Sequence, residues 1–178
     1  MSSIQLAQRP GTTSRADLYD KQLQALARIS RTLSRVQQIE DILAQVLAVL
    51  HDHLGLLHGL VSISDPQHGA LQVGAIHSDS QAVVSACENV RYRIGEGVIG
   101  NVLKHGNSVV LGRISSEPRF LDRLALYDLE LPFIAVPIKT HEGNTIGVLA
   151  AQPEGRADEL LPDRARFMEI VANLLAQT

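Results

Sequence analysis

The sequence has few residues of the kinds that many functional sites require. It contains one cysteine, no tryptophan and only 3% aromatic residues among 178. Cys87 alone excludes an intramolecular disulfide and a CxxC redox pair, and such cysteine usage is typical of a reducing compartment. Because aromatic side chains are scarce, platforms for stacking nucleic-acid bases are scarce as well, and the core is expected to be aliphatic.

Charge and hydrophobic runs narrow the range of partners further. The formal net charge of -3 provides no general attraction to nucleic acids or anionic lipids. No apolar run approaches the length of a membrane span, and the first ten residues lack the apolar centre of a signal peptide. We therefore expect a cytoplasmic protein that contacts neither a membrane nor, directly, a nucleic acid.

The domain organisation follows from length and composition. Residues 1–16 mix Ser, Thr, Gln, Gly and Pro without apolar periodicity, which predicts a disordered leader. Residues 17–178 are long enough for a single domain with a sizeable core.

The chain is organised around the stretch from Val90 to Leu111. Gly95 and Gly97 permit a tight turn, residues 98–103 have the apolar spacing of one helical face, and Gly106 ends that helix. The glycines match the dinucleotide fingerprint G-x-G-x-x-G, but that fingerprint requires an apolar parallel strand before it and a long crossover helix after it. Here the preceding strand carries two arginines and the helix is short, so nucleotide binding is disfavoured.

Helices are predicted at both ends of the chain. The first has an apolar stripe that begins at Leu23, a second with a broader apolar face runs from about residue 38 to 54, and a third starts near Pro162. The first stripe comprises Leu23, Leu26, Ala27, Ile29, Ser30 and Leu33, and the last comprises Phe167, Ile170, Val171, Leu174 and Leu175.

Between these helices the sequence predicts strands, most of them joined as hairpins. Residues 56–64 and 70–76 form one pair, and residues 132–139 and 145–151 form another. A short helix is expected within residues 78–86, and a helical pattern passes through Leu121, Leu124, Ala125 and Leu129. The fold class is therefore α+β, with a mostly antiparallel sheet, terminal helices on one face, and short helices and loops that form a ligand pocket on the other.

This order of elements resembles the GAF domain family over roughly residues 18–177. The resemblance depends on the glycine stretch together with Pro-Phe-Ile-Ala-Val-Pro-Ile-Lys at 132–139 and Gly-Asn-Thr-Ile-Gly-Val-Leu-Ala-Ala at 143–151. Several phrases, among them Ser-Val-Val-Leu-Gly-Arg-Ile at 108–114, are similar to the regulatory GAF domains of bacterial activators that work with sigma-N RNA polymerase.

The resemblance implies a regulatory domain rather than a catalytic one. It implies control of an attached AAA+ ATPase, a response to 2-oxoglutarate, and resistance to an inhibitory flavoprotein partner. No cofactor other than such an effector is expected. The sequence has no phosphate-binding G-x-x-x-x-G-K-[ST] motif and no basic recognition helix, so the ATPase and a DNA-binding unit are not within this chain.

Arginines are the candidate ligand-binding residues, because a dicarboxylate requires permanently charged, bidentate partners. The candidate arginines fall in segments expected to border the pocket. His77, at a strand end, is added as a polar contact. The predicted set is Arg91, Arg93, Arg113, Arg119 and His77, with Arg123 nearby. Arg91 and Arg93 share one face of a strand, with Tyr92 on the other. For any one arginine, a solvated surface position is the alternative.

No catalytic or metal site is predicted. The seven histidines are scattered over separate elements, Cys87 has no base beside it in sequence, and no serine stands in G-x-S-x-G. The alternative to a ligand sensor is a dimerisation and interaction module with a vestigial pocket. In either case the apolar surface of the terminal helices exceeds what one sheet face can cover, so a homodimer through these helices is expected.

Overall fold

A six-stranded antiparallel sheet is the centre of the structure, a computed structural model that describes residues 13–35 and 38–178. The strand order is β3-β2-β1-β6-β5-β4. The strands are β1 (Leu56–Asp65), β2 (Ala70–Ile76), β3 (Arg91–Arg93), β4 (Val109–Leu111), β5 (Phe133–Lys139) and β6 (Thr145–Pro153). The expected α+β class and the predicted hairpins are confirmed.

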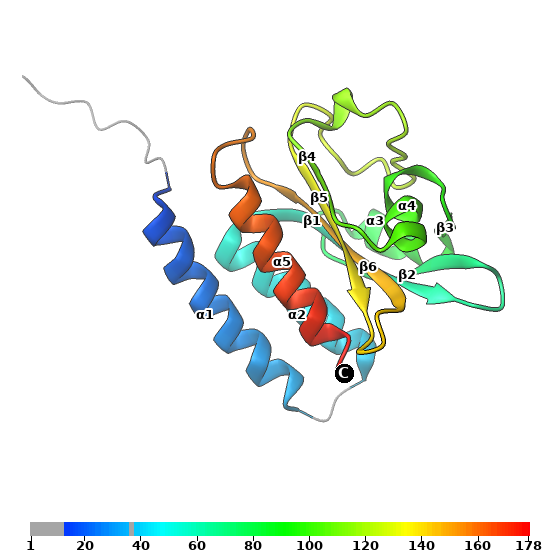
Figure 1. Cartoon of the computed structure of the whole chain (residues 1–178), viewed down its shortest axis with the longest axis horizontal. Helices are drawn as coiled ribbons and strands as arrows, with labels where there is room; N and C mark the ends of the chain where they lie inside the picture. The colour runs from blue at the N-terminus through cyan, green and yellow to red at the C-terminus, as the bar shows by residue number, and fades with distance from the viewer. Residues whose placement is uncertain (1–12, 36–37) are drawn as a thin grey trace, which may run out of the picture.

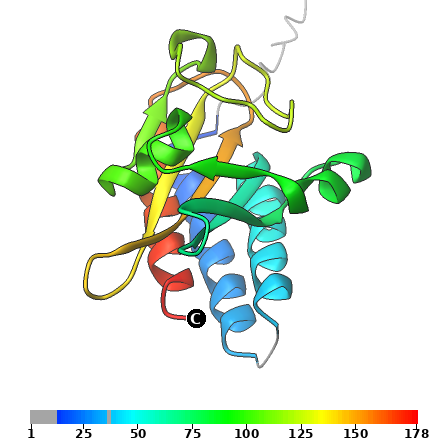
Figure 2. The same cartoon turned by 90° about the vertical axis from the view of Figure 1, so that its right-hand side faces the viewer.

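The two faces of the sheet are covered by different elements (Figures 1 and 2). The long helices α1, α2 and α5 lie on one side, and α3, α4 and an irregular segment at residues 112–132 lie on the other. The helices are α1 (Arg15–Leu33), α2 (Ile39–Leu54), α3 (Gln81–Ala86), α4 (Gly97–His105) and α5 (Leu161–Leu175), with short 3-10 turns η1 (Cys87–Asn89) and η2 (Ile114–Ser116). In the described part of the chain, no helix combines the length and hydrophobicity needed to cross a membrane.

Helix α1 packs on the other two long helices rather than on the sheet (Figure 1). It starts at Arg15, two residues before the expected beginning of the domain, because Ser14 and Asp17 form a capping box there. Residues 1–12 of the predicted leader lie outside the described residues. The buried side chains of α1 are Leu18, Ala25 and Ile29.

The predicted apolar stripes of the terminal helices are only partly buried. Leu23 of α1 is 66% exposed and Ile170 of α5 is 45% exposed, in agreement with the expectation that these helices carry more apolar surface than one sheet face can cover. Ala27 is exposed as well. Hydrophobic periodicity alone gives a broad sector of the helix, whereas the line of contact is set by the groove into which α1 fits.

The helix expected through Leu121 and Leu129 is not formed. The carboxylate of Asp122 instead accepts hydrogen bonds from the backbone N–H groups of Leu126 and Tyr127, each at 3.0 Å. Such local bonds from a side chain to the backbone compete with helical bonds. The result is a turn, with Ala125 at a φ of 49°.

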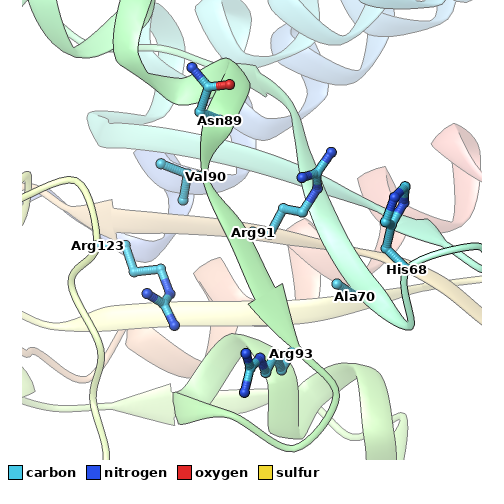
Figure 3. A pocket seen from close by; sticks show the side chains of 7 residues that line it. All are labelled: His68, Ala70, Asn89, Val90, Arg91, Arg93 and Arg123. Atoms are coloured by element: carbon cyan, nitrogen blue, oxygen red, sulfur yellow. The ribbon is translucent and has the colours of Figure 1, made fainter.

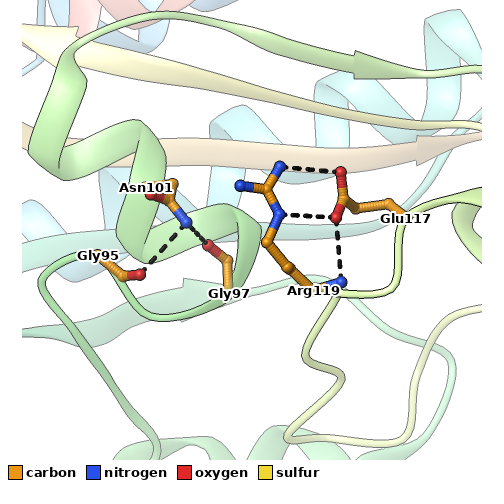
Figure 4. Close-up of polar contacts among 5 residues, drawn as sticks. All are labelled: Gly95, Gly97, Asn101, Glu117 and Arg119. Carbon is orange, nitrogen blue, oxygen red and sulfur yellow. Dashed lines mark hydrogen bonds and ion pairs between the residues drawn. The ribbon is translucent and has the colours of Figure 1, made fainter.

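The glycine motif is used to pack α4 closely against β3. A Cβ atom at Gly100 would lie 2.2 Å from the carbonyl oxygen of Arg93, and Gly97 has a φ of 61°. Asn101 donates hydrogen bonds from Nδ2 to the carbonyl oxygens of Gly95 and Gly97, at 3.2 and 2.6 Å (Figure 4). These contacts account for the motif without a nucleotide.

We predict that Gly100→Ala lowers the free energy of unfolding by about 2–3 kcal/mol, because the added methyl group can be accommodated only if α4 moves away from β3. Gly112→Ala is the matched control, since its Cβ would meet its nearest atom at an ordinary 3.7 Å. Urea denaturation of the two variants measures the difference. Equal stabilities would show that the close approach is not required.

Candidate functional site

The irregular segment at residues 112–132 is held over the sheet by a buried amide. Gln152 of β6 is fully buried, and its Oε1 accepts a hydrogen bond from the N–H of Asp128 at 3.0 Å. Its Nε2 donates to the carbonyl oxygens of Asp128 at 2.8 Å and Pro132 at 3.3 Å. One side chain thus satisfies three backbone groups that no sheet partner reaches, and it fixes the end of the segment.

The space between this segment and the sheet is filled mainly by apolar side chains. Phe120, Tyr127 and Phe133 meet edge to face, with ring centroids 4.9–5.6 Å apart. The sequence has only six phenylalanines and tyrosines in total, so half of them gather in this one cluster. Aromatic contacts of this geometry stabilise the segment against the sheet.

Three buried polar side-chain atoms have no hydrogen-bond partner in the described part of the chain: the hydroxyls of Ser62 and Tyr127 and Nδ1 of His58. The rings of Tyr127 and His58 lie 6.2 Å apart. Burial raises the pKa of Tyr127 well above its ordinary value, so the group remains a hydroxyl and a donor. A buried polar atom without a partner costs about 1–3 kcal/mol, and this cost marks the pair as possible contacts for a polar ligand.

A second candidate ligand-binding site lies at the free edge of the sheet, where arginines gather around β3 (Figure 3). A hollow of about 470 Å³ is lined by Arg91, Arg93 and Arg123, together with His68 and neighbouring residues. Arg91 and Arg93 are exposed, while Tyr92 between them is buried, so the predicted alternation along this strand is confirmed. The two guanidinium groups therefore project from the side of β3 that faces away from the apolar cluster.

Glu96 and Arg123 connect this edge to the irregular segment. The carboxylate of Glu96 accepts hydrogen bonds from the backbone N–H of Arg93 at 2.9 Å and from Arg123 at 2.5 Å, and these two donors hold its pKa below the ordinary value. The guanidinium of Arg123 also lies 5.9 Å from the centre of the Tyr92 ring. Burial, followed by the charge of Asp122, raises the pKa of Tyr92 to about 12.

Arg91 and Arg93 form no ion pair within residues 13–35 and 38–178, whereas Arg123 is paired with Glu96. The charge of Arg93 also helps to lower the pKa of Glu96, after the two hydrogen bonds to that carboxylate. Exposed guanidinium groups without an ion-pair partner attract an anion. This arrangement favours a ligand with one or two carboxylates.

The structure does not bring the other predicted arginines into this hollow. Arg113 is exposed and lies 3.5 Å from a carboxylate oxygen of Glu130. Arg119 is exposed and donates two hydrogen bonds to Glu117, at 2.9 and 3.1 Å (Figure 4). Both are neutralised by neighbours in the irregular segment.

His77 also lies apart from the arginines, at the end of β2. Its ring is 4.5 Å from the ring of His51, and burial followed by the charge of His51 lowers its pKa. Among the residues that the structure describes, no group of three or more His, Cys, Asp or Glu side chains has an arrangement that could hold a metal ion.

The sequence analysis did not single out Gln152, Tyr127 or His58. A signal was present for the first two, since Gln152 is a polar residue at the end of an apolar strand and Tyr127 belongs to a rare residue type in this chain. His58 could not be identified, because its role depends on a φ of 48° within β1 and on a register shift between Leu57 and Leu60.

Comparison with known proteins gives a consistent result at the levels of family, sequence and fold. The family model described as "GAF domain" matches residues 38–178. The chain is 76% identical over 97% of its length to the Nif-specific regulatory protein of Azotobacter vinelandii and 46% identical over 94% to that of Klebsiella oxytoca. It spans about a third of the length of these relatives, 33% and 32%.

Among solved structures, the chain is similar to the GAF domain of nlh2 from A. aeolicus in an inactive state. The TM-score is 0.79, the identity is 24%, and the match covers 90% of this chain and 96% of that one. At this identity the likeness shows the fold alone.

We predict that Tyr127→Phe raises the free energy of unfolding by about 1 kcal/mol, because it removes a buried hydroxyl without a partner and leaves the ring contacts intact. Tyr19→Phe is the control, since the Tyr19 hydroxyl is exposed and donates to Asp163 at 3.3 Å. Thermal and urea unfolding of both variants provide the measurement. A clear loss of stability in Tyr127→Phe would mean that the hydroxyl has a partner in the folded protein.

Proposed function

This chain belongs to the GAF domain family, and from that premise we propose that it is the effector-sensing regulatory domain of a nitrogen-fixation transcriptional activator of the NifA type. The observation that carries the proposal is the 76% identity, over nearly the whole chain, to a Nif-specific regulatory protein. That relative is about three times as long as this chain, which leaves room in it for further domains. The role proposed here is regulation rather than catalysis.

The proposed output is control of an attached AAA+ ATPase that acts on sigma-N RNA polymerase in the cytoplasm. Within this scheme the domain also sets the response to the inhibitory partner NifL. A regulatory domain exerts such control when its ligand binds one of two conformations more tightly than the other. The irregular segment is suited to this role, because it has little regular secondary structure and depends on a few side-chain hydrogen bonds.

The proposed effector is 2-oxoglutarate or a similar dicarboxylate. Arg91 and Arg93 supply two guanidinium groups at the edge of the sheet that form no ion pair in the described part of the chain, and each can bind a carboxylate through paired N–H groups. Arg123 joins the same hollow to the irregular segment. An anion bound at this edge would compete with Glu96 for Arg123 and would therefore alter the position of the segment.

The alternative is an interaction module with a vestigial pocket. One observation favours it: the space between the segment and the sheet is occupied largely by apolar side chains, which leaves few polar groups for a ligand. The two functions differ in ligand response. A ligand that binds only the folded state raises the unfolding temperature in a concentration-dependent manner, whereas a vestigial pocket gives no shift.

We predict that 2-oxoglutarate binds in a calorimetric titration and that Arg91→Ala and Arg93→Ala each weaken binding by about 1.5–3 kcal/mol, or roughly ten- to a hundredfold. The matched control is Arg119→Ala, which removes an exposed arginine already neutralised by Glu117. Binding that is unchanged in both hollow variants would place the effector elsewhere. No binding by the unmodified protein would favour the interaction module.

A further inference from the structure

The turn between β1 and β2 carries a histidine whose ring is held by a carboxylate. Oδ2 of Asp65 lies 2.6 Å from Nδ1 of His68, and Oδ1 of Asp65 accepts a hydrogen bond from the N–H of Gln67 at 3.1 Å. The carbonyl of Asp65 also accepts a hydrogen bond from the N–H of His68 at 3.3 Å, which closes the turn. Asp65 thus fixes both the turn and the ring, although 57% of the His68 side chain is exposed to solvent.

His68 belongs to the same hollow as the arginines of β3. It lies on one side of the hollow and Arg123 on the other, with Arg91 and Arg93 between them (Figure 3). Strand pairing explains this placement, because Ala70, two residues after His68, pairs with Arg93 across β2 and β3. Side chains from the turn, from β3 and from the irregular segment therefore surround one space.

The contact with Asp65 determines what the other ring nitrogen of His68 can do. A carboxylate only accepts hydrogen bonds, so Nδ1 carries the proton in this contact. In the neutral ring Nε2 is then an acceptor, and its lone pair repels a carboxylate. In the charged ring Nε2 is a donor, and the positive charge attracts the same carboxylate. Protonation of Nε2 thus converts His68 from a group that repels an anion into one that binds it.

Of the described residues that line the hollow, only His68 is of a type that changes charge near neutral pH. Arginines remain charged throughout this range. Two carboxylates act on the lining residues: Asp65, whose pKa is lowered chiefly by the hydrogen bond from His68, and Glu96, whose pKa is lowered by hydrogen bonds from Arg93 and Arg123. Both carboxylates therefore stay ionised between about pH 6 and pH 8, the range in which histidine side chains titrate.

We propose that His68 is a proton-dependent partner of the anionic effector in this hollow and makes effector binding sensitive to pH. The inference rests on the proposed binding of a dicarboxylate at Arg91 and Arg93, and it adds a residue and a form of regulation to that site. The arginines supply a constant attraction. His68 supplies an attraction that is present below about pH 6 and is lost as the pH rises towards about 8. Because the ligand favours the protonated ring, binding takes up protons at neutral pH.

The exposure of His68 limits the size of the effect. An ion pair that stays in contact with water strengthens binding by up to about fivefold, and added salt weakens it. The contribution of His68 is therefore smaller than the roughly ten- to hundredfold effect expected for each arginine.

The test is a calorimetric titration of the full chain with 2-oxoglutarate at constant ionic strength and several pH values. We expect the dissociation constant of the unmodified protein to rise about fivefold between about pH 6 and pH 8, and that of His68→Gln to stay constant. His141→Gln is the matched control, because His141 is exposed in the turn between β5 and β6 and does not line the hollow. This control should keep the pH dependence of the unmodified protein.

The heat of binding, measured in two buffers with different ionisation enthalpies, gives the number of protons taken up. At neutral pH the unmodified protein should take up a fraction of a proton for each ligand bound, and His68→Gln should take up none, a difference that a purely structural role of the turn would not produce. Binding that does not vary with pH, or a pH dependence undiminished in His68→Gln, would overturn this inference and leave the proposed sensing function intact. No binding by the unmodified protein at any pH would overturn both.

Discussion

The candidate site depends most on the hydrogen bonds between the carboxamide of Gln152 and the backbone of the irregular segment. An irregular segment can form a layer over a sheet only if its backbone groups find partners, because unpaired buried groups cost too much free energy. Gln152 supplies three of these partners from a strand that is itself fixed in the middle of the sheet. Gln152 thus holds the end of the segment, and Asp122 holds the turn from which Tyr127 enters the aromatic cluster.

The glycine motif and the irregular segment together connect the edge of the sheet to its interior. Close packing at Gly100 keeps α4 against β3, and Glu96 at the start of α4 binds Arg123 of the segment. A ligand that changes the charge in the hollow would therefore act on Glu96 and Arg123, which connect the segment to the edge of the sheet. On the opposite face the long helices bury the other side chains of the same strands, so the sheet is the physical link between an edge ligand and those helices.

The sequence was sufficient to predict the strands, the hairpins and the two-sided arrangement, because alternation and turn residues are local signals. It also placed Arg91 and Arg93 on one face of β3. It failed where tertiary contacts decide: Asp122 replaced an expected helix with a turn, and the groove between α2 and α5 selected which side of α1 is buried. The polar residue Gln152 stands out at the end of an apolar strand, but its partner Asp128 lies 24 positions away, so no local pattern could reveal which groups it binds.

The most direct test of this account is hydrogen exchange in Gln152→Leu. The substitution keeps a side chain of similar volume but removes the acceptor of the Asp128 N–H and the side-chain donor to the carbonyls of Asp128 and Pro132, so that the Asp128 carbonyl keeps only its bond from the N–H of Leu131. The account predicts that the amides of Ile114, Ser115 and Leu131, which are hydrogen-bonded within or next to the segment, exchange at least about tenfold faster, while those of β1 keep their protection. Unchanged exchange in the segment, or an equal increase throughout the sheet, would contradict it.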